Sequence, residues 1–163
     1  MLTRRAAFSV LGSLILAPAA FAQAPIRFRG FTVDVDPLRT DMGDDTANWV
    51  AQTLPPALQQ SLGPYIDPRD RRAPLLIVRI DFVYLGPNIG PGPFATSQDT
   101  IEGSFIIKGP RGTVPTEIPL RAITTYYPNG TDQALWVQAN YYRVLRLAQT
   151  FAGWAPRQLG LTS

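Results

Sequence analysis

Three consecutive stretches of alternating apolar and polar residues constrain the fold of this chain more than any other feature. They span residues 75–85, 99–108 and 114–127. A period of two residues is typical of a β-strand that buries one face and exposes the other. Residues 110–113 have the composition of a tight turn between the second and third of these strands, and we expect all three strands to form a β-meander.

The first of these stretches predicts which side chains form the core. Ile80 and Phe82 belong to its uncharged set, and we expect both to lie between the sheet and the helices. Arg79 and Asp81 belong to the opposite set, which predicts a second, polar face of the sheet. Glu102, on the next strand, is expected on that polar face as well.

A shorter alternating segment and a helical segment precede these strands. Residues 26–36 predict a strand that stops at Pro37, and residues 44–62 place apolar side chains at a helical period. Pro55 and Pro56 fall inside the helical segment and remove two backbone donors. The sequence therefore predicts a kinked helix there or two short helices.

A second helical segment follows the strands, and with it the fold class can be stated. Thr131 or Asp132 can cap a long helix that runs to about Trp154, with Arg143 on its solvent-exposed side. The element order is then β-α-β-β-β-α. This order predicts an α+β two-layer sandwich: an antiparallel sheet of about four strands with both helices packed on one face. Residues 23–163 should form this single domain.

The first 22 residues have the pattern of an export signal peptide. Two arginines precede an apolar run at residues 6–16, and cleavage after Ala22 would leave a chain that begins at Gln23. The start of the chain, TRRAAF, resembles the twin-arginine export motif, and the general secretory route is the alternative. The apolar run is too short to span roughly 30 Å of hydrocarbon as a helix. We expect a periplasmic protein with no membrane span after cleavage.

The composition excludes several kinds of chemistry, because the chain contains no cysteine and no histidine. Thiolate zinc sites, cysteine nucleophiles, histidine bases and Ser-His-Asp triads are therefore impossible. Lipid attachment to a cysteine is impossible too. The carboxylates between Asp34 and Asp45 do not match a calcium-binding loop, and we interpret them as solvated strand residues and helix caps. We expect no catalytic residues, no metal and no cofactor.

The charge of the chain argues against nucleic acid as a partner. The net charge is +3 at pH 7, and two of the arginines that contribute to it, Arg4 and Arg5, belong to the leader. The densest basic segment, residues 69–72, is interrupted by an acid. A phosphate backbone is bound by a longer positive surface than this.

Two regions are candidate binding sites. The first is the polar sheet face, where Arg79, Asp81 and Glu102 are expected to form pairs across strands. The second is the loop at 86–98, which is longer than a hairpin needs. Ile89 and Phe94 are apolar residues of this loop, and they either fold back onto the sheet or contact a partner.

Two classes of function remain open from these observations. The first is a non-enzymatic exported protein that serves as a binding or accessory module for another cell-envelope component, a protein partner in particular. The alternative is a carboxylate-dependent hydrolase, or a small-ligand binder, that uses Asp81 and Glu102 on the polar face. The first class is favoured, because the sequence contains few residues that could act as catalysts. The sequence does not indicate an oligomeric state.

Overall fold

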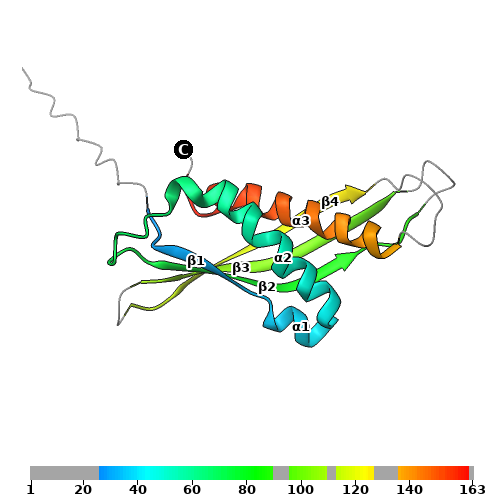
Figure 1. The fold of residues 1–163 in the computed structure, drawn as a ribbon, viewed down its shortest axis with the longest axis horizontal. Coiled ribbons are helices and arrows are strands. Elements are labelled where there is room, and N and C mark those ends of the chain that lie inside the picture. The colour runs from blue at the N-terminus through cyan, green and yellow to red at the C-terminus, as the bar shows by residue number, and fades with distance from the viewer. Residues whose placement is uncertain (1–25, 90–95, 110–112, 127–135, 162–163) are drawn as a thin grey trace, which may run out of the picture.

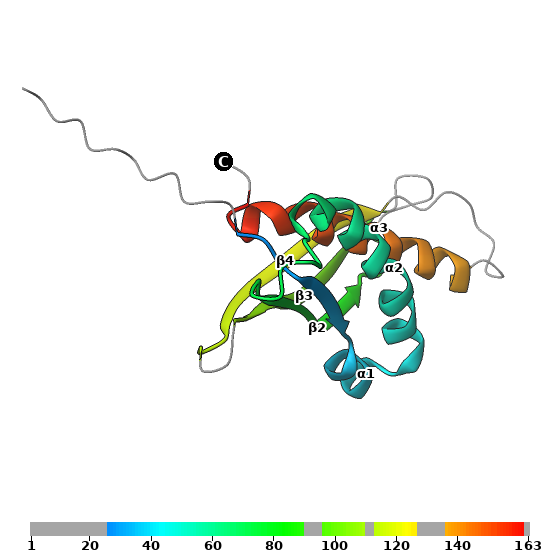
Figure 2. The same ribbon diagram turned by 60° about the vertical axis from the view of Figure 1, so that its left-hand side comes forward.

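The structure is a computed structural model that describes residues 26–89, 96–109, 113–126 and 136–161. It confirms the α+β sandwich: helices α2 and α3 lie together on one face of a four-stranded sheet (Figures 1 and 2). The leader, Phe94 and the turn at 110–112 lie outside the described residues. The elements are β1 (Gly30–Asp34), α1 (Asp36–Met42), α2 (Asp44–Leu62), the 3-10 helix η1 (Gly63–Tyr65), β2 (Leu75–Leu85), β3 (Ser97–Lys108), β4 (Thr116–Tyr126) and α3 (Trp136–Gln158).

The strands lie in the order β1-β2-β3-β4, and the expected meander is present as the antiparallel pairs β2-β3 and β3-β4. The expectation of an entirely antiparallel sheet is wrong for β1, which pairs parallel with β2. The reason is the connection between them. The chain returns through α1 and α2 to the end of the sheet where β1 began, and such a crossover joins parallel strands.

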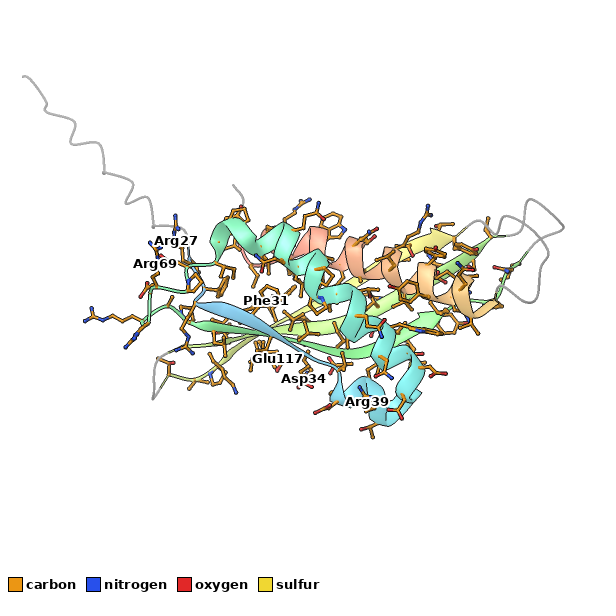
Figure 3. All side chains as sticks on the ribbon, in the orientation of Figure 1. Arg27, Phe31, Asp34, Arg39, Arg69 and Glu117 are labelled. Atoms are coloured by element: carbon orange, nitrogen blue, oxygen red, sulfur yellow. The ribbon has the colours of Figure 1, made fainter. Side chains whose placement is uncertain are left out.

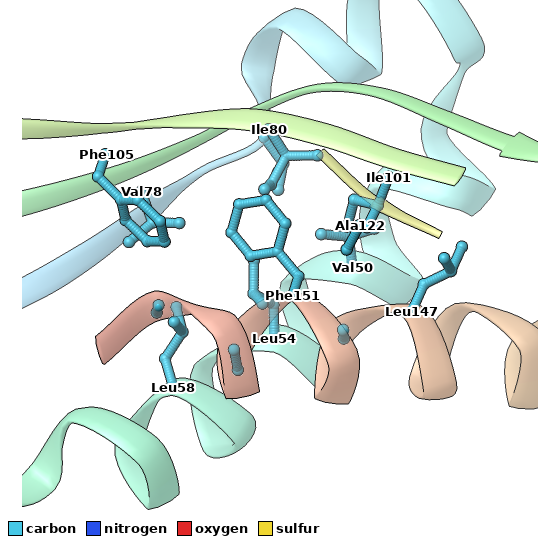
Figure 4. Packing of buried hydrophobic residues seen from close by; sticks show 14 of the residues in the cluster. Val50, Leu54, Leu58, Val78, Ile80, Ile101, Phe105, Ala122, Leu147 and Phe151 are labelled. Atoms are coloured by element: carbon cyan, nitrogen blue, oxygen red, sulfur yellow. The ribbon is translucent and has the colours of Figure 1, made fainter. Parts of the chain in front are cut away.

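The core lies between the sheet and the two long helices. Phe151 of α3 points toward the strands, and its ring centroid is 5.4 Å from that of Phe105 on β3 (Figure 4). Leu54 and Leu58 of α2 and Ile80 of β2 are fully buried in the same cluster. Burial of each such side chain contributes about 1.5–3 kcal/mol to folding, so this layer contact is the main source of stability.

The helices differ from the sequence predictions at three places. A short helix that was not predicted, α1, begins at Asp36. Pro37 lies in its first turn, a position to which proline is well suited. Helix α2 continues through Pro55 and Pro56, so the alternative of two short helices is wrong. Buried leucines on both sides of the prolines hold the helix against the sheet despite the two missing donors. Helix α3 ends at Gln158, beyond the expected Trp154.

Strand β2 contains a β-bulge that reverses the predicted faces of its second half. Ile80 pairs with Gly103, but the next paired residue is Phe82, opposite Glu102, so Asp81 is an extra residue. The prediction that Phe82 lies in the core is wrong: this residue is 40% exposed, whereas Val83 is 1% exposed. Gly103 has a role here, because a Cβ at this position would lie 2.2 Å from the carbonyl oxygen of Arg79.

No helix in the described part of the chain is both long and apolar enough to cross a membrane.

Candidate functional site: the open sheet face and the neck of the β2–β3 loop

Within the described part of the chain, α2 and α3 both lie on one side of the sheet, and we call the opposite side the open face. Asp34 and Glu117 are on this side, whereas Phe31 points toward the helices (Figure 3). The register of the strands places the other members. They include Thr32, Ile77, Arg79, Asp81, Phe82, Tyr84, Glu102, Ile106, Arg121 and Ile123.

Arg79 is at the centre of a charged network on the open face. Its Nε donates to Oδ1 of Asp81 at 2.7 Å, and its Nη2 donates to Oε1 of Glu117 at 2.7 Å. The hydrogen bond with Asp81 raises the pKa of Arg79 above its ordinary value. Desolvation of the guanidinium opposes this rise, and the charges of Asp81 and Glu117 add to it. The network therefore ties β2 to β4 across β3 while remaining partly solvated.

Glu102 belongs to a separate ion pair. Its Oε1 lies 3.1 Å from Nε of Arg121 in an ion pair, and the two residues are direct neighbours on β3 and β4. The structure thus brings Arg79 and Asp81 together but pairs Glu102 with an arginine of its own. Both carboxylates are neutralised by arginines, which is the cross-strand arrangement expected on a solvated sheet face.

Next to these charges lies an apolar patch that we define as Phe82, Tyr84 and Ile123. These residues are 40%, 47% and 45% exposed, respectively. The rings of Phe82 and Tyr84 are stacked, with centroids 6.5 Å apart and planes 4° from parallel. The patch follows from the β-bulge, because without the extra residue Asp81 both rings would face the helices. Sequence alternation alone therefore missed it.

The loop between β2 and β3 has an ordered neck. Ile89 and Thr96 form a β-bridge in which their backbone N–H and carbonyl groups exchange hydrogen bonds of 2.8 and 3.0 Å. Ile89 is 73% exposed, so it does not fold back onto the sheet. The position of Phe94, the second apolar residue of the loop, is outside the described residues.

The base of the neck is held by a buried group that we call the Arg143 cluster, formed by Arg143, Asp99, Gly86 and Ser97. Arg143 donates from Nε to Asp99 Oδ2 at 2.9 Å and from Nη2 to the Gly86 carbonyl at 2.6 Å and to Ser97 Oγ at 3.1 Å. A further contact joins Nη2 to Asp99 Oδ1. The Gly86 N–H donates to the same Oδ1 at 3.1 Å.

The prediction that Arg143 lies on the solvent-exposed side of its helix is therefore wrong. Arg143 is 8% exposed, and its guanidinium also lies 5.3 Å from the ring centroid of Tyr126. One signal in the sequence could have indicated this. Asp99 has the same strand parity as the inward residues Ile101 and Phe105, so a charged residue occupied a core position and required a buried partner.

Both ends of the 86–98 loop are fixed to α3 by this cluster. Gly86 stands at one end, and Ser97 stands near the other. Gly86 also needs its lack of a side chain, because a Cβ there would lie 2.4 Å from the carbonyl oxygen of Gln98. The loop thus leaves the sandwich from a rigid base, on which Ile89 is presented to solvent.

A hollow of about 490 Å³ lies between β4 and α3. Its lining is formed by Thr124, Thr125, Arg146, Gln149 and Thr150. Neither Asp81 nor Glu102 belongs to this lining. Within the described ranges, no three carboxylates gather closely enough to hold a metal ion.

Comparison with known proteins identifies the fold. No protein-family model matches the chain, and no curated protein matches its sequence. Among solved structures, the chain is similar to rare lipoprotein B from Shewanella oneidensis, with 10% identity, a TM-score of 0.50, and coverage of 80% of this chain and 93% of that one. A minor lipoprotein from Acinetobacter baumannii has 16% identity, a TM-score of 0.45, and coverage of 83% and 92%. At such identity, the first similarity shows a shared fold.

Proposed function

We propose that this chain is an exported, non-enzymatic protein of the cell envelope that binds another envelope component through its open face. Three observations support the proposal. The sequence begins with an export-signal pattern. Its fold is shared with a protein whose name is that of a lipoprotein. The sequence contains neither cysteine nor histidine, so catalysis by these residues and lipid attachment to a cysteine are excluded.

The observation that carries the proposal is the apolar patch. Phe82 and Tyr84 are large, stacked and nearly half exposed, although the same strand buries Ile80 and Val83 completely or almost so. Exposed aromatic side chains beside charged residues are typical of protein interfaces, where they provide the buried centre of the contact. A protein surface complementary to Phe82, Tyr84 and Ile123 would cover this patch.

The charged residues of the open face would set the orientation of the partner. The guanidinium groups of Arg79 and Arg121 lie beside the patch as hydrogen-bond donors, and the carboxylates paired with them are hydrogen-bond acceptors. Such pairs contribute more to specificity and to the association rate than to affinity. We propose that Ile89 extends this surface at the end of the sheet and that Phe94 is a second contact from the same loop.

The hydrolase alternative has less support. Asp81 and Glu102 are bound by two different arginines, and they do not line the hollow between β4 and α3. Glycoside hydrolysis needs two carboxyl groups that face a common cleft. The open face instead presents its carboxylates as members of surface ion pairs.

Photo-crosslinking in living cells tests the proposal. A photoreactive phenylalanine analogue replaces Phe82 in one strain and Tyr84 in another, and a matched control places it at Gln60, an exposed position of α2. We expect the same discrete adduct from positions 82 and 84 and none from position 60. Loss of the adduct when Ile123→Ser is added would support the patch. Absence of an adduct at both sheet positions would contradict the proposal.

A further inference from the structure

Strand β4 is one edge of the sheet, and its two halves are protected differently. In the first half, Pro119 interrupts the edge, and the Gln158 side chain donates to the Pro119 carbonyl at 2.9 Å. Prolines and charged side chains commonly protect edge strands from pairing with a further strand. The second half, residues 122–126, contains neither proline nor charge and includes the β-branched sequence Ile123-Thr124-Thr125. Among the described residues, β4 pairs only with β3.

The proline also shows which backbone groups of β4 face the free edge. A proline has no N–H, so in a sheet it occupies positions where this group would point away from the neighbouring strand. Pro119 lies opposite Ser104 of β3. Because the direction alternates with each residue, the N–H and carbonyl groups of Arg121, Ile123 and Thr125 also point outward. These groups form a template for one more strand.

The hollow lies beside this template, on the helix side of the sheet. Thr124 is a helix-side residue of β4, and Arg146, Gln149 and Thr150 share one side of α3 because they are three and four residues apart. Arg146 is exposed, and no carboxylate or hydrogen-bond partner contacts it within the described residues. Its guanidinium, with two hydroxyls and an amide nearby, is complementary to a carboxylate.

We propose that the second half of β4 accepts an extended strand from a partner protein, and that an Asp or Glu side chain of this strand enters the hollow and pairs with Arg146. The backbone groups of Ile123 and Thr125 would provide the strand-to-strand hydrogen bonds. Side chains of the added strand alternate, so those beside the acidic one would lie next to Ile123 and should be apolar. The backbone edge of β4 and the hollow are separate from the open face, although the Ile123 side chain also belongs to the apolar patch. The inference does not rest on the proposed function.

The test uses a synthetic eight-residue peptide with a defined pattern. Valine and threonine alternate around one central glutamate, with a lysine at each end for solubility; the matched peptide contains glutamine in place of glutamate. Titration of the purified protein is followed by NMR and calorimetry. We expect the amides of Ile123 and Thr125 to shift and to exchange more slowly with solvent when the glutamate peptide binds. The glutamine peptide should bind about tenfold more weakly.

Two variants separate the backbone contribution from that of the arginine. Thr125→Pro removes an outward N–H in the manner of Pro119, and it should abolish binding while thermal stability is retained. Thr125→Val, its matched control, keeps the N–H and should bind normally. Arg146→Gln should remove the preference for the glutamate peptide over the glutamine peptide.

Several outcomes would overturn the inference. They are no binding of either peptide, undiminished binding by Thr125→Pro, an unchanged glutamate preference in Arg146→Gln, or binding that free sulfate displaces completely. A dimer in sedimentation experiments that Thr125→Pro dissociates would show that a second copy occupies the edge, which also contradicts the inference. None of these results changes the crosslinking expected at Phe82 and Tyr84, so the two proposals fail separately.

Discussion

Arg143 and Arg79 are both arginines that pair with an aspartate, but they lie in opposite environments. In the Arg143 cluster, the side chains of Arg143 and Asp99 are 9% and 0% exposed. In the network on the open face, Arg79 and Asp81 are 31% and 39% exposed. The same pair of residue types is thus a structural clamp in one place and a solvated surface group in the other.

The comparison shows that burial decides what an arginine–aspartate ion pair contributes to the molecule. Removal of one member of a buried ion pair leaves an uncompensated charge without water, which is strongly destabilising. A solvated pair exchanges its partner for water at little cost. The Arg143 cluster is therefore suited to hold the base of the 86–98 loop, whereas the Arg79 network is free to exchange partners in a complex.

The largest expected effect is at the buried cluster. Asp99→Ala should lower the free energy of unfolding by about 3–5 kcal/mol, because the guanidinium of Arg143 would lose its carboxylate and remain buried. Equilibrium unfolding in urea, followed by circular dichroism, measures this change.

A double variant serves as the control for this prediction. Asp99→Leu combined with Arg143→Met removes both charges and should destabilise the protein less than Asp99→Ala alone, because no unpaired charge is left. A loss below about 1 kcal/mol for Asp99→Ala would show that the cluster is solvated like the Arg79 network.

Smaller losses of unfolding free energy are expected when residues of β2 after the bulge are shortened. Residues on its buried and open sides should differ. Val83→Ala should cost about 2 kcal/mol because Val83 is buried, and Phe82→Ala should cost less than this despite the larger deletion. Both are measured by urea unfolding. The opposite order would mean that β2 continues without the bulge at Asp81.

The smallest effect is expected in the Arg79 network. Glu117→Gln should change the free energy of unfolding by less than about 1 kcal/mol, and the change should diminish as sodium chloride is added, because salt screens partly exposed charges. The measurement is thermal unfolding of both proteins at low and high salt. A large loss that salt does not reduce would assign Glu117 to a buried site.

The fold was largely predictable from local pattern. The period of two in residues 75–85 and the helical period in residues 44–62 are properties of the chain itself, because a buried face requires apolar side chains at those spacings. The edge position of Pro119 was also predictable from the residue itself, because a proline has no N–H to donate to a neighbouring strand. The parallel pairing of β1 was not recognised, because it depends on the path of the crossover.

The candidate site was predicted only in part. Arg79 and Asp81 meet because they are two residues apart on one strand, and this proximity follows from strand geometry. Glu102 takes a different partner, Arg121, because register places those two side by side. The apolar patch was missed, since a single extra residue in β2 moves Phe82 and Tyr84 to the other face.

The sequence by itself determines the order along the chain of the four strands and the two long helices, the two-layer architecture and the absence of cysteine and histidine chemistry, because periodicity and composition are local properties. Only the tertiary structure decides which face Phe82 occupies and whether Arg143 is buried. The bulge depends on the close approach of β2 to Gly103, and the burial of Arg143 depends on Asp99, which is 44 residues away in the chain. Such contacts arise between elements distant in sequence, and no period within one element specifies them.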